Sequence, residues 1–147
     1  MNIPLVKRAM EFYKVREIPG KKHNNFIVDW TNRILSWAYD DEIPWCSSFM
    51  NAMAQDVGLE HTGKANARSW LSIGVEVENP VISDVVIFWR ENRNSWKGHV
   101  GIFMGYRYDK RYIAVLGGNQ SNEVNISLYP ISRLLGFRRL RKQKDIS

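Results

Sequence analysis

Pro44-Trp45-Cys46-Ser47-Ser48-Phe49-Met50 is the stretch around which the sequence is organised, because it places the single cysteine where a proline-marked segment becomes a helix. The apolar residues that follow recur at helical spacing, which predicts a helix with one buried face. They are Phe49, Met50, Met53 and Val57. Cys46 then lies in the first helical turn, where unpaired N–H groups and the helix dipole favour a thiolate over a thiol. A lone cysteine on an apolar face is also a common core residue, so both a nucleophile and a packing residue remain open.

Length and composition indicate one folded domain, residues 1–147, with a basic C-terminal tail at residues 138–147. The six Trp, six Tyr and six Phe supply enough large apolar side chains for a core, which excludes a disordered chain. One cysteine cannot form an internal disulfide, in keeping with folding in a reducing compartment. Lys7, Arg8 and Glu11 interrupt the first apolar run, so we expect synthesis in the cytoplasm without a signal peptide and no membrane insertion.

The formal net charge of +6 has a local origin near the C-terminus. Between positions 133 and 144 every charged residue is basic: Arg133, Arg138, Arg139, Arg141, Lys142 and Lys144. Such a cluster predicts an anionic partner, and nucleic acid, a cell-wall polymer or a membrane surface would each satisfy it. A solvated terminus without a partner explains the same residues.

Helical periodicity comes first in the chain and strand periodicity comes afterwards. We expect helices over residues 3–16, 24–37, 46–57 and 67–71, and strands over 85–89, 98–104, 111–116, 124–128 and 136–140. Residues 117–122, Gly-Gly-Asn-Gln-Ser-Asn, are expected to form a loop. This order predicts the α+β class, in which N-terminal helices pack on a C-terminal antiparallel β-sheet of about five to six strands.

A nucleophilic cysteine needs a base, and the base needs a third group that fixes its ring. Of the three histidines, His23 and His61 lie in polar, loop-like segments, whereas His99 opens a predicted strand between two glycines. Asn119 follows the next strand and can accept a hydrogen bond from the imidazole through its side-chain carbonyl. Cys46, His99 and Asn119 therefore form a predicted triad. Asn119 beside two glycines is also typical of a turn residue in the left-handed conformation.

Cysteine and histidine are also metal ligands, so a zinc site is a competing interpretation. The sequence has no CxxC, HxxxH or HxxE spacing, and the ligands would have to come singly from distant segments. No glycine-rich loop leads from a strand into a helix, since Gly117-Gly118 leads into another strand. We therefore expect no metal, nucleotide or other cofactor.

Five blocks of the sequence occur in a characteristic order and spacing. They are Trp45-Cys46-Ser47-Ser48-Phe49, Ala67-Arg68-Ser69-Trp70, Ser83-Asp84-Val85-Val86-Ile87-Phe88, Gly98-His99-Val100-Gly101 and Leu116-Gly117-Gly118-Asn119-Gln120. Together they resemble the CHAP family, the cysteine, histidine-dependent amidohydrolases/peptidases, and within it the small phage- and prophage-associated branch. The resemblance implies one papain-like catalytic domain with Cys46 as nucleophile, His99 as base and Asn119 as orienting residue. Many family members carry a carboxylate two residues before that asparagine, where this chain has Gly117.

The resemblance also implies a substrate, bacterial peptidoglycan, and a reaction, hydrolysis of one of its amide bonds. The bond joins N-acetylmuramic acid to L-alanine, or lies within the peptide stem or cross-bridge. We expect a monomer that acts in the periplasm or cell wall, after release as a phage-type endolysin or secretion as an antibacterial effector. An effector would also need a secretion apparatus and an immunity protein.

Four residues near the triad are candidates for substrate binding: Trp45, Arg68, Trp96 and Gln120. The two tryptophans, together with Trp70, offer flat surfaces for sugar rings or the peptide stem. Arg68 can pair with a stem carboxylate or with the acidic residues at 40–41.

A basic nucleic-acid-binding module is the alternative from another functional class, with Cys46 and His99 as packing residues. It would place the C-terminal cations on phosphates and the exposed aromatic residues on bases. The cations cluster at one terminus and are not interleaved with the aromatic residues, so we do not expect nucleic acid as a partner. Alkylation by iodoacetamide separates the two hypotheses, because a thiolate reacts quickly and a buried thiol reacts slowly.

Overall fold

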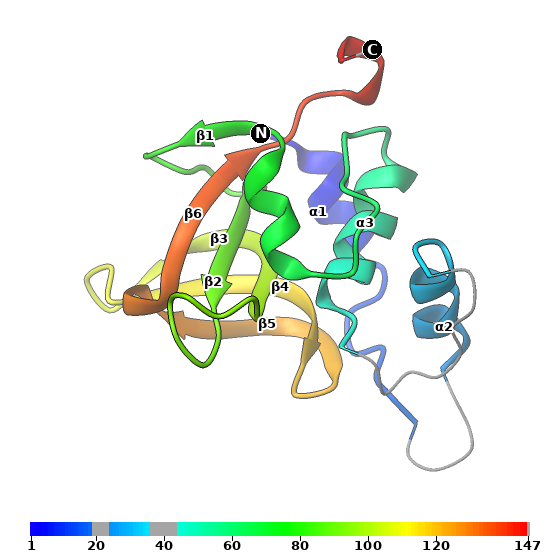
Figure 1. Cartoon of the computed structure of the whole chain (residues 1–147), viewed down its shortest axis with the longest axis horizontal. Helices are drawn as coiled ribbons and strands as arrows, with labels where there is room; N and C mark the ends of the chain where they lie inside the picture. The colour runs from blue at the N-terminus through cyan, green and yellow to red at the C-terminus, as the bar shows by residue number, and fades with distance from the viewer. Residues whose placement is uncertain (19–23, 36–43, 147) are drawn as a thin grey trace.

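The computed structural model describes residues 1–18, 24–35 and 44–146, and it has the predicted α+β class (Figure 1). Its α-helices are α1 (Ile3–Met10), α2 (Asn25–Asn32) and α3 (Cys46–Asp56). Its strands are β1 (Val75–Val77), β2 (Val85–Trp89), β3 (Gly98–Arg107), β4 (Tyr112–Gln120), β5 (Glu123–Pro130) and β6 (Leu134–Arg139). Short 3-10 helices are η1 (Ala67–Ser72), η2 (Ile131–Arg133) and η3 (Gln143–Asp145). The strands form one antiparallel sheet in the order β1-β6-β2-β3-β4-β5.

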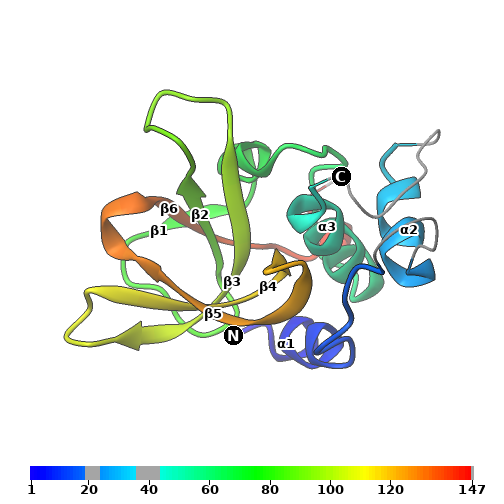
Figure 2. The same ribbon diagram turned by 90° about the horizontal axis from the view of Figure 1, so that it is seen from below.

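Strand β2 lies inside the sheet and is buried on both faces, as its unbroken apolar sequence predicted. Val85 and Ile87 belong to the core shared with the helices, and Val86 and Phe88 belong to a second cluster on the other face. The helices gather on the first face, with α1 and α3 against the sheet and α2 beyond α3 (Figure 1, Figure 2). The sheet is therefore the common wall of both clusters.

The start of α3 is held tightly against strand β4. Gly118 permits this approach, because a Cβ atom there would come within 2.6 Å of Cζ3 of Trp45 and within 2.8 Å of Cβ of Phe49. A larger residue would push the helix and the strand apart. On the other side, Nε1 of Trp70 donates a hydrogen bond of 2.9 Å to Oγ of Ser47, which ties η1 to the same turn. The first turn of α3 is thus fixed between β4 and η1.

The N-terminal helix is shorter than its amphipathic pattern predicted. It ends at Met10, because the chain then turns toward β5, where the N–H of Lys14 donates to the carbonyl oxygen of Val124 at 2.7 Å. Lys14 adopts a left-handed φ of 75°, which is incompatible with further helix. The second helix is also shorter than predicted, since α2 ends at Asn32 with Arg33 as its C-cap. Trp37, His23 and the acidic residues at 40–42 lie outside the described residues. Among residues 1–18, 24–35 and 44–146, no helix has the length and apolar character needed to cross a membrane.

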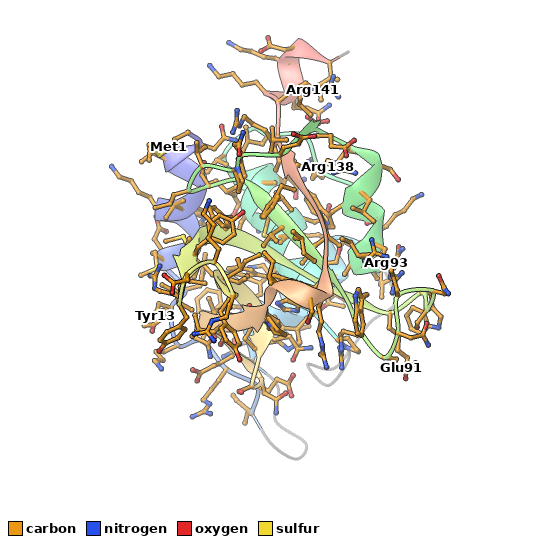
Figure 3. The ribbon with its side chains drawn as sticks, turned by 90° about the vertical axis from the view of Figure 1, so that its left-hand side faces the viewer. Met1, Tyr13, Glu91, Arg93, Arg138 and Arg141 are labelled. Atoms are coloured by element: carbon orange, nitrogen blue, oxygen red, sulfur yellow. The ribbon has the colours of Figure 1, made fainter. Side chains whose placement is uncertain are left out.

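The basic C-terminal residues are built into the fold and do not form a free tail. Arg138 and Arg139 belong to β6, and the guanidinium of Arg139 donates hydrogen bonds of 2.9 and 2.8 Å to the buried carboxylate of Asp84. Arg141 donates to the buried carboxylate of Glu60 through its backbone N–H and its guanidinium, at 2.7, 2.9 and 3.1 Å. Figure 3 shows Arg138 and Arg141 at one end of the molecule. Two of the predicted free cations therefore neutralise buried carboxylates.

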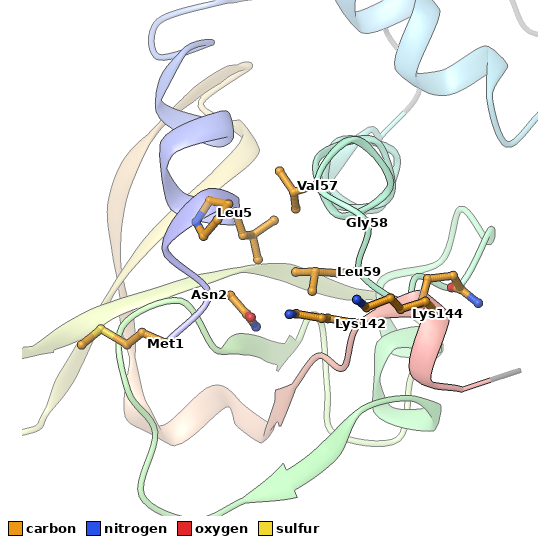
Figure 4. A pocket seen from close by; sticks show the side chains of 10 residues that line it. Met1, Asn2, Leu5, Val57, Gly58, Leu59, Lys142 and Lys144 are labelled. Atoms are coloured by element: carbon orange, nitrogen blue, oxygen red, sulfur yellow. The ribbon is translucent and has the colours of Figure 1, made fainter.

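A cavity of about 840 Å³ lies between the N-terminus, the end of α3 and η3 (Figure 4). Leu5, Val57 and Leu59 give it an apolar wall, and Lys142 and Lys144 stand beside them. The described residues that line this cavity include no cysteine, histidine or carboxylate. It therefore supplies no nucleophile, base or acid, and the candidate chemistry lies elsewhere.

Candidate active site

Cys46 is the first residue of α3 and is almost buried, with 6% of its surface exposed. Burial raises the pKa of its thiol above the ordinary value. The backbone N–H groups of Val100, Ser47 and Cys46 itself lower that pKa, as does the positive charge of Arg90, but burial is the larger effect. The folded protein therefore favours a neutral thiol, whereas the helix start alone had predicted a thiolate. The backbone donors of the helical turn are present, and the burial of Cys46 agrees with the core position that its apolar helix face also indicated.

His99 lies at the start of β3, next to Val100, whose N–H acts on the sulfur. His99 is 5% exposed, and its ring stacks on that of Tyr129, with 4.8 Å between the ring centroids and 17° between the planes. Burial is the main reason that the pKa of His99 falls to about 4, and the positive charge of Arg90 also lowers it. The imidazole is therefore neutral at pH 7 and can accept a proton.

The hydrogen-bond partner of the imidazole is Gln120, whose Oε1 lies 2.9 Å from Nε2 of His99. The other contacts of the amide fix its orientation, since Nε2 of Gln120 donates to the carbonyl oxygens of Val115 at 3.1 Å and Asn125 at 2.8 Å. With its nitrogen engaged, the amide presents its oxygen to the ring and accepts a hydrogen bond from it. His99 therefore carries its proton on Nε2 and leaves Nδ1 free to act as a base.

The prediction that Asn119 holds the ring was wrong, and the reason is a local change in strand geometry. Residues 117–122 were expected to form a loop, but β4 continues to Gln120, with a register shift between Gly117 and Gln120. Asn119 occupies this bulge in the left-handed conformation, with φ of 57°, which is the turn role that its neighbouring glycines also indicated. The bulge brings the next side chain, Gln120, back toward His99.

Gly117 explains how Gln120 reaches the ring. A Cβ atom at position 117 would lie 2.8 Å from Oε1 of Gln120 and 3.5 Å from Nε2 of His99. Gln120 thus occupies the space that a side chain at 117 would need to contact the imidazole. Many CHAP proteins carry a carboxylate at the position of Gly117. Here Gly117 has no side chain, and the amide of Gln120 occupies the space beside the imidazole.

Two adjoining cavities open beside these groups, and Arg90 lines both of them. The cysteine cavity, about 170 Å³, is lined by Cys46 and by Trp96, which is 73% exposed. The histidine cavity, about 330 Å³, is lined by His99 and Arg133. The sulfur of Cys46 and the imidazole of His99 thus belong to two cavities that share Arg90 as a lining residue, and we refer to the two cavities together as the cleft.

Known proteins resemble this chain in fold and not in sequence. No family model matches the chain, and no curated protein sequence matches it. A solved structure described as similar to a lipoprotein, NLP/P60 family, from Staphylococcus aureus aligns over 92% of this chain and 40% of its own length, at 13% identity and a TM-score of 0.52. An NlpC/P60 family protein from Bacillus cereus aligns over 93% of this chain and 39% of its own length, at 14% identity and a TM-score of 0.56.

The chain has the NlpC/P60 fold. It spans about two fifths of the length of the two proteins that share it. On this α+β framework the nucleophile candidate comes from a helix start and the base candidate from a strand of the sheet, which is the arrangement that the papain-like prediction required.

On the NlpC/P60 fold, the predicted substrate-binding residues separate into exposed and structural ones. Trp96 is exposed at the cysteine cavity and is free to contact a substrate. Trp45 and Trp70 are fully buried, and Nε1 of Trp45 donates a hydrogen bond of 2.7 Å to Oε1 of Glu17. Neither of these two tryptophans offers a surface to a substrate, contrary to the prediction.

Arg68 clamps the loop between β2 and β3. Its Nε donates to the carbonyl oxygen of Lys97 at 2.8 Å, its Nη1 to that of Arg93 at 2.8 Å, and its Nη2 to that of Asn92 at 3.1 Å. Figure 3 labels Arg93 on this loop. All three nitrogens of the guanidinium bind backbone, so Arg68 positions the loop that carries Trp96 and does not serve as the predicted partner of a stem carboxylate.

Arg90, Tyr129 and Arg133 are residues of the cleft that sequence reasoning missed. The antiparallel pairing of β2 with β3 brings Arg90, directly after β2, to the same sheet edge as His99. The sequence signal for Arg90 was its position directly after an uninterrupted apolar strand, because residues at strand ends lie at the rim of a sheet, where functional side chains are common. Tyr129 gave no signal beyond its alternating strand pattern.

Proposed function

We propose that the protein is a cysteine amidase or peptidase that hydrolyses an amide bond of bacterial peptidoglycan. The observation that carries the proposal is the buried hydrogen bond between His99 and Gln120, which orients a neutral imidazole beside the helix start that bears the only cysteine. The NlpC/P60 fold and the CHAP-like sequence blocks support the same chemistry, because both families are related to papain-like cysteine peptidases.

The proposed reaction is an acyl transfer to sulfur followed by hydrolysis. Nδ1 of His99 takes the thiol proton, and the sulfur of Cys46 attacks the amide carbonyl carbon. The backbone N–H of Cys46 faces the developing oxyanion at the helix start. The imidazolium gives its proton to the leaving amine as the C–N bond breaks and a thioester forms. Water, deprotonated by the same imidazole, then releases the acid and restores the thiol.

The resting protein holds both groups in their neutral forms. Burial raises the pKa of Cys46 and lowers that of His99, so thiol and imidazole coexist at pH 7. Within the described part of the chain, the sulfur and the imidazole share no direct hydrogen bond. Substrate binding therefore has to bring the two side chains together before the proton moves, as is common for catalytic contacts in unliganded enzymes.

Two observations weigh against the nucleic-acid-binding alternative. Arg139 and Arg141, which it placed on phosphates, pair with buried carboxylates. Trp45 and Trp70 are buried in the core, so neither is among the exposed aromatic residues that this alternative requires for stacking. A role in cell-wall breakdown, as a phage-type endolysin or a secreted antibacterial effector with its immunity protein, uses the cleft and needs neither pair of residues.

Digestion of purified peptidoglycan sacculi, with mass spectrometry of the soluble products, tests the proposal. Wild-type protein should release fragments whose masses identify the bond as the muramoyl–alanine amide or one within the stem or cross-bridge. Cys46→Ala and His99→Ala should release none while unfolding cooperatively near the wild-type temperature. Undiminished release by a folded Cys46→Ala protein would end the proposal.

A further inference from the structure

We infer that Arg90 and Arg133 bind a carboxylate on the amine half of the substrate, the half that leaves with the proton from His99. The inference rests on the proposed function and adds to it a substrate class: an amide whose leaving amine belongs to an acidic segment. The two guanidinium groups would determine which leaving segment binds, and neither would exchange a proton or form a covalent bond with the substrate.

The charge of the histidine cavity carries the first step. Arg90 and Arg133 line it, and none of its described lining residues is Asp or Glu. Neither guanidinium forms a hydrogen bond or ion pair with a described residue, and Arg133 lies over the ring of Trp89 at 5.2 Å from its centroid. Two exposed guanidinium groups without a carboxylate in one cavity leave donors available to an anion.

Arginines elsewhere in the described residues are used differently. Four of them form ion pairs with protein carboxylates at 3.1 Å or less: Arg8, Arg33, Arg139 and Arg141. Arg68 and Arg138 donate instead to backbone carbonyl oxygens. Arg93, on the exposed β2–β3 loop, is the other described arginine whose guanidinium has no such partner, so Arg90 and Arg133 are distinguished by lining the cavity beside the proposed base.

The position of His99 decides which half of the substrate enters the histidine cavity. The imidazolium donates its proton to the leaving nitrogen, so that nitrogen has to lie next to the ring. The chain attached to the nitrogen then continues into the cavity that His99 lines. The acyl half stays over Cys46, in the cysteine cavity with the exposed Trp96. Arg90, which lines both cavities, stands at the junction.

Carboxylate is the anion that suits this arrangement. The free anionic groups of a peptide are its carboxylates, and the planar fork of a guanidinium matches a carboxylate with two parallel hydrogen bonds. The guanidinium of Arg133 already lies against the ring of Trp89. Less side-chain conformational entropy is therefore lost when it binds an anion. Amidation of the same carboxylate would keep its size and remove its charge.

Matched muropeptides test the inference. The probes are muropeptides released from sacculi by a muramidase, and the same muropeptides after carbodiimide conversion of their carboxylates to methylamides. Wild-type protein should show a KM about tenfold lower for the carboxylate form, the size expected of one hydrogen bond between charged groups, with a smaller change in kcat. Arg133→Gln should raise KM for the carboxylate form about tenfold and leave the methylamide form unchanged, and Arg133→Lys should restore part of the difference.

Arg133 is a cleaner variant than Arg90, because Arg90 also acts on the pKa values of Cys46 and His99 and its loss should change kcat as well. Arg93→Gln is the matched control, since it removes the same charge from the β2–β3 loop at a residue that lines neither cavity. Binding of both probes to Cys46→Ala, followed by the fluorescence of exposed Trp96, gives a readout that does not depend on turnover.

The outcomes separate the inference from the proposed function. Cleavage of both probes with equal KM, or an Arg133→Gln protein that loses affinity for both alike, would overturn the carboxylate assignment and leave the hydrolase in place. No cleavage by wild-type protein, together with no binding by Cys46→Ala, would overturn both. A charge-dependent KM that vanishes in Arg133→Gln and persists in Arg93→Gln is the expected result.

Discussion

Oε1 of Gln120 lies 2.9 Å from Nε2 of His99, and both residues are almost completely buried. The amide nitrogen of Gln120 is anchored on carbonyl oxygens of β4 and β5, so two neighbouring strands set the orientation of the ring. The hydrogen bond from this neutral amide fixes the tautomer and raises the pKa of His99, but by less than burial lowers it. This agrees with the pKa of about 4 that burial gives His99.

Gln120→Ala should lower kcat/KM about 10²-fold, because the ring loses its tautomer and its orientation. Gln120→Glu places a carboxylate beside Nε2, which should raise the pKa of His99 and move the acid limb of the pH–rate profile upward. Steady-state kinetics on soluble muropeptides measure both effects. Asn119→Gly keeps the left-handed backbone and should lose far less activity than Gln120→Ala; the opposite ranking would restore Asn119 as the orienting residue.

The thiol of Cys46 should react slowly with iodoacetamide at pH 7 even when it is the nucleophile, because burial keeps it neutral, so slow labelling does not separate the hydrolase from the nucleic-acid-binding alternative. Burial raises its pKa above the ordinary value of 9.0, so the thiolate fraction, and with it the alkylation rate, should rise about tenfold per pH unit through this range. Arg90→Gln should slow the reaction further at each pH, since the lost positive charge lowers the thiol pKa in the wild type. Mass spectrometry of the alkylated protein gives the rates. Fast labelling at pH 7 that no longer rises with pH would instead show a thiolate.

Hydrolysis should persist into acidic solution. Below a pKa of about 4 the imidazole of His99 is protonated and cannot take the thiol proton, so kcat/KM should fall only as the pH drops through about 4. Above that limb it should stay level until the thiol itself loses its proton. A pH–rate profile on soluble muropeptides, with folding checked by circular dichroism at each pH, measures this. An acid limb near the ordinary histidine pKa of 6.5 would contradict a buried, neutral base.

The class of the fold could be predicted because its elements depend on local patterns. The spacing from Cys46 to Val57 is helical, and β2 is an uninterrupted apolar run, so both elements are visible within a few residues. The early end of the first helix could not be predicted, because it depends on a hydrogen bond from Lys14 to Val124, 110 positions away in the chain.

The finer features of the site depend on geometry that no local pattern encodes. Asn119 and Gln120 are adjacent amides in the sequence, and only the bulge in β4 decides which of them faces His99. Arg68 was predicted to bind an anion, but its guanidinium binds the carbonyl oxygens of a loop about 25 residues further along the chain. The sequence alone does not distinguish these two roles of an arginine. The sequence indicated both a thiolate and a core position for Cys46, and only tertiary packing decides that burial has the larger effect on its pKa.

Arg68→Lys should loosen the β2–β3 loop without unfolding the domain. Lysine keeps the charge but cannot reach three carbonyl oxygens at once, so amide hydrogen exchange over residues 92–97 should accelerate. Because this loop carries Trp96, kcat/KM should fall about tenfold. Arg107→Lys, whose guanidinium donates only to the neighbouring Tyr106 carbonyl, is the control. Equal exchange rates in wild-type and Arg68→Lys proteins would rule out the clamp.

Glu60 should make the stability of the fold depend on pH. Its carboxylate accepts hydrogen bonds from the N–H of Gly74 and from three nitrogens of Arg141, which joins the C-terminal segment to the rest of the domain. Burial alone would raise the pKa of Glu60, but the hydrogen bonds and charge of Arg141 outweigh it and lower the pKa below the ordinary 4.5. The ionised form is therefore favoured by folding.

A carboxylate whose pKa is lower in the folded state contributes stability that is complete above its unfolded pKa and is lost as the pH falls through its folded pKa. Glu60→Gln should therefore reduce the free energy of unfolding by about 1–3 kcal/mol at pH 7, and the difference from wild type should shrink as the pH falls below 4.5. Urea unfolding between pH 3 and pH 7 measures it, with Glu78→Gln as a control at an exposed carboxylate. A difference that is the same at every pH would mean that Glu60 contributes by packing and not through its charge.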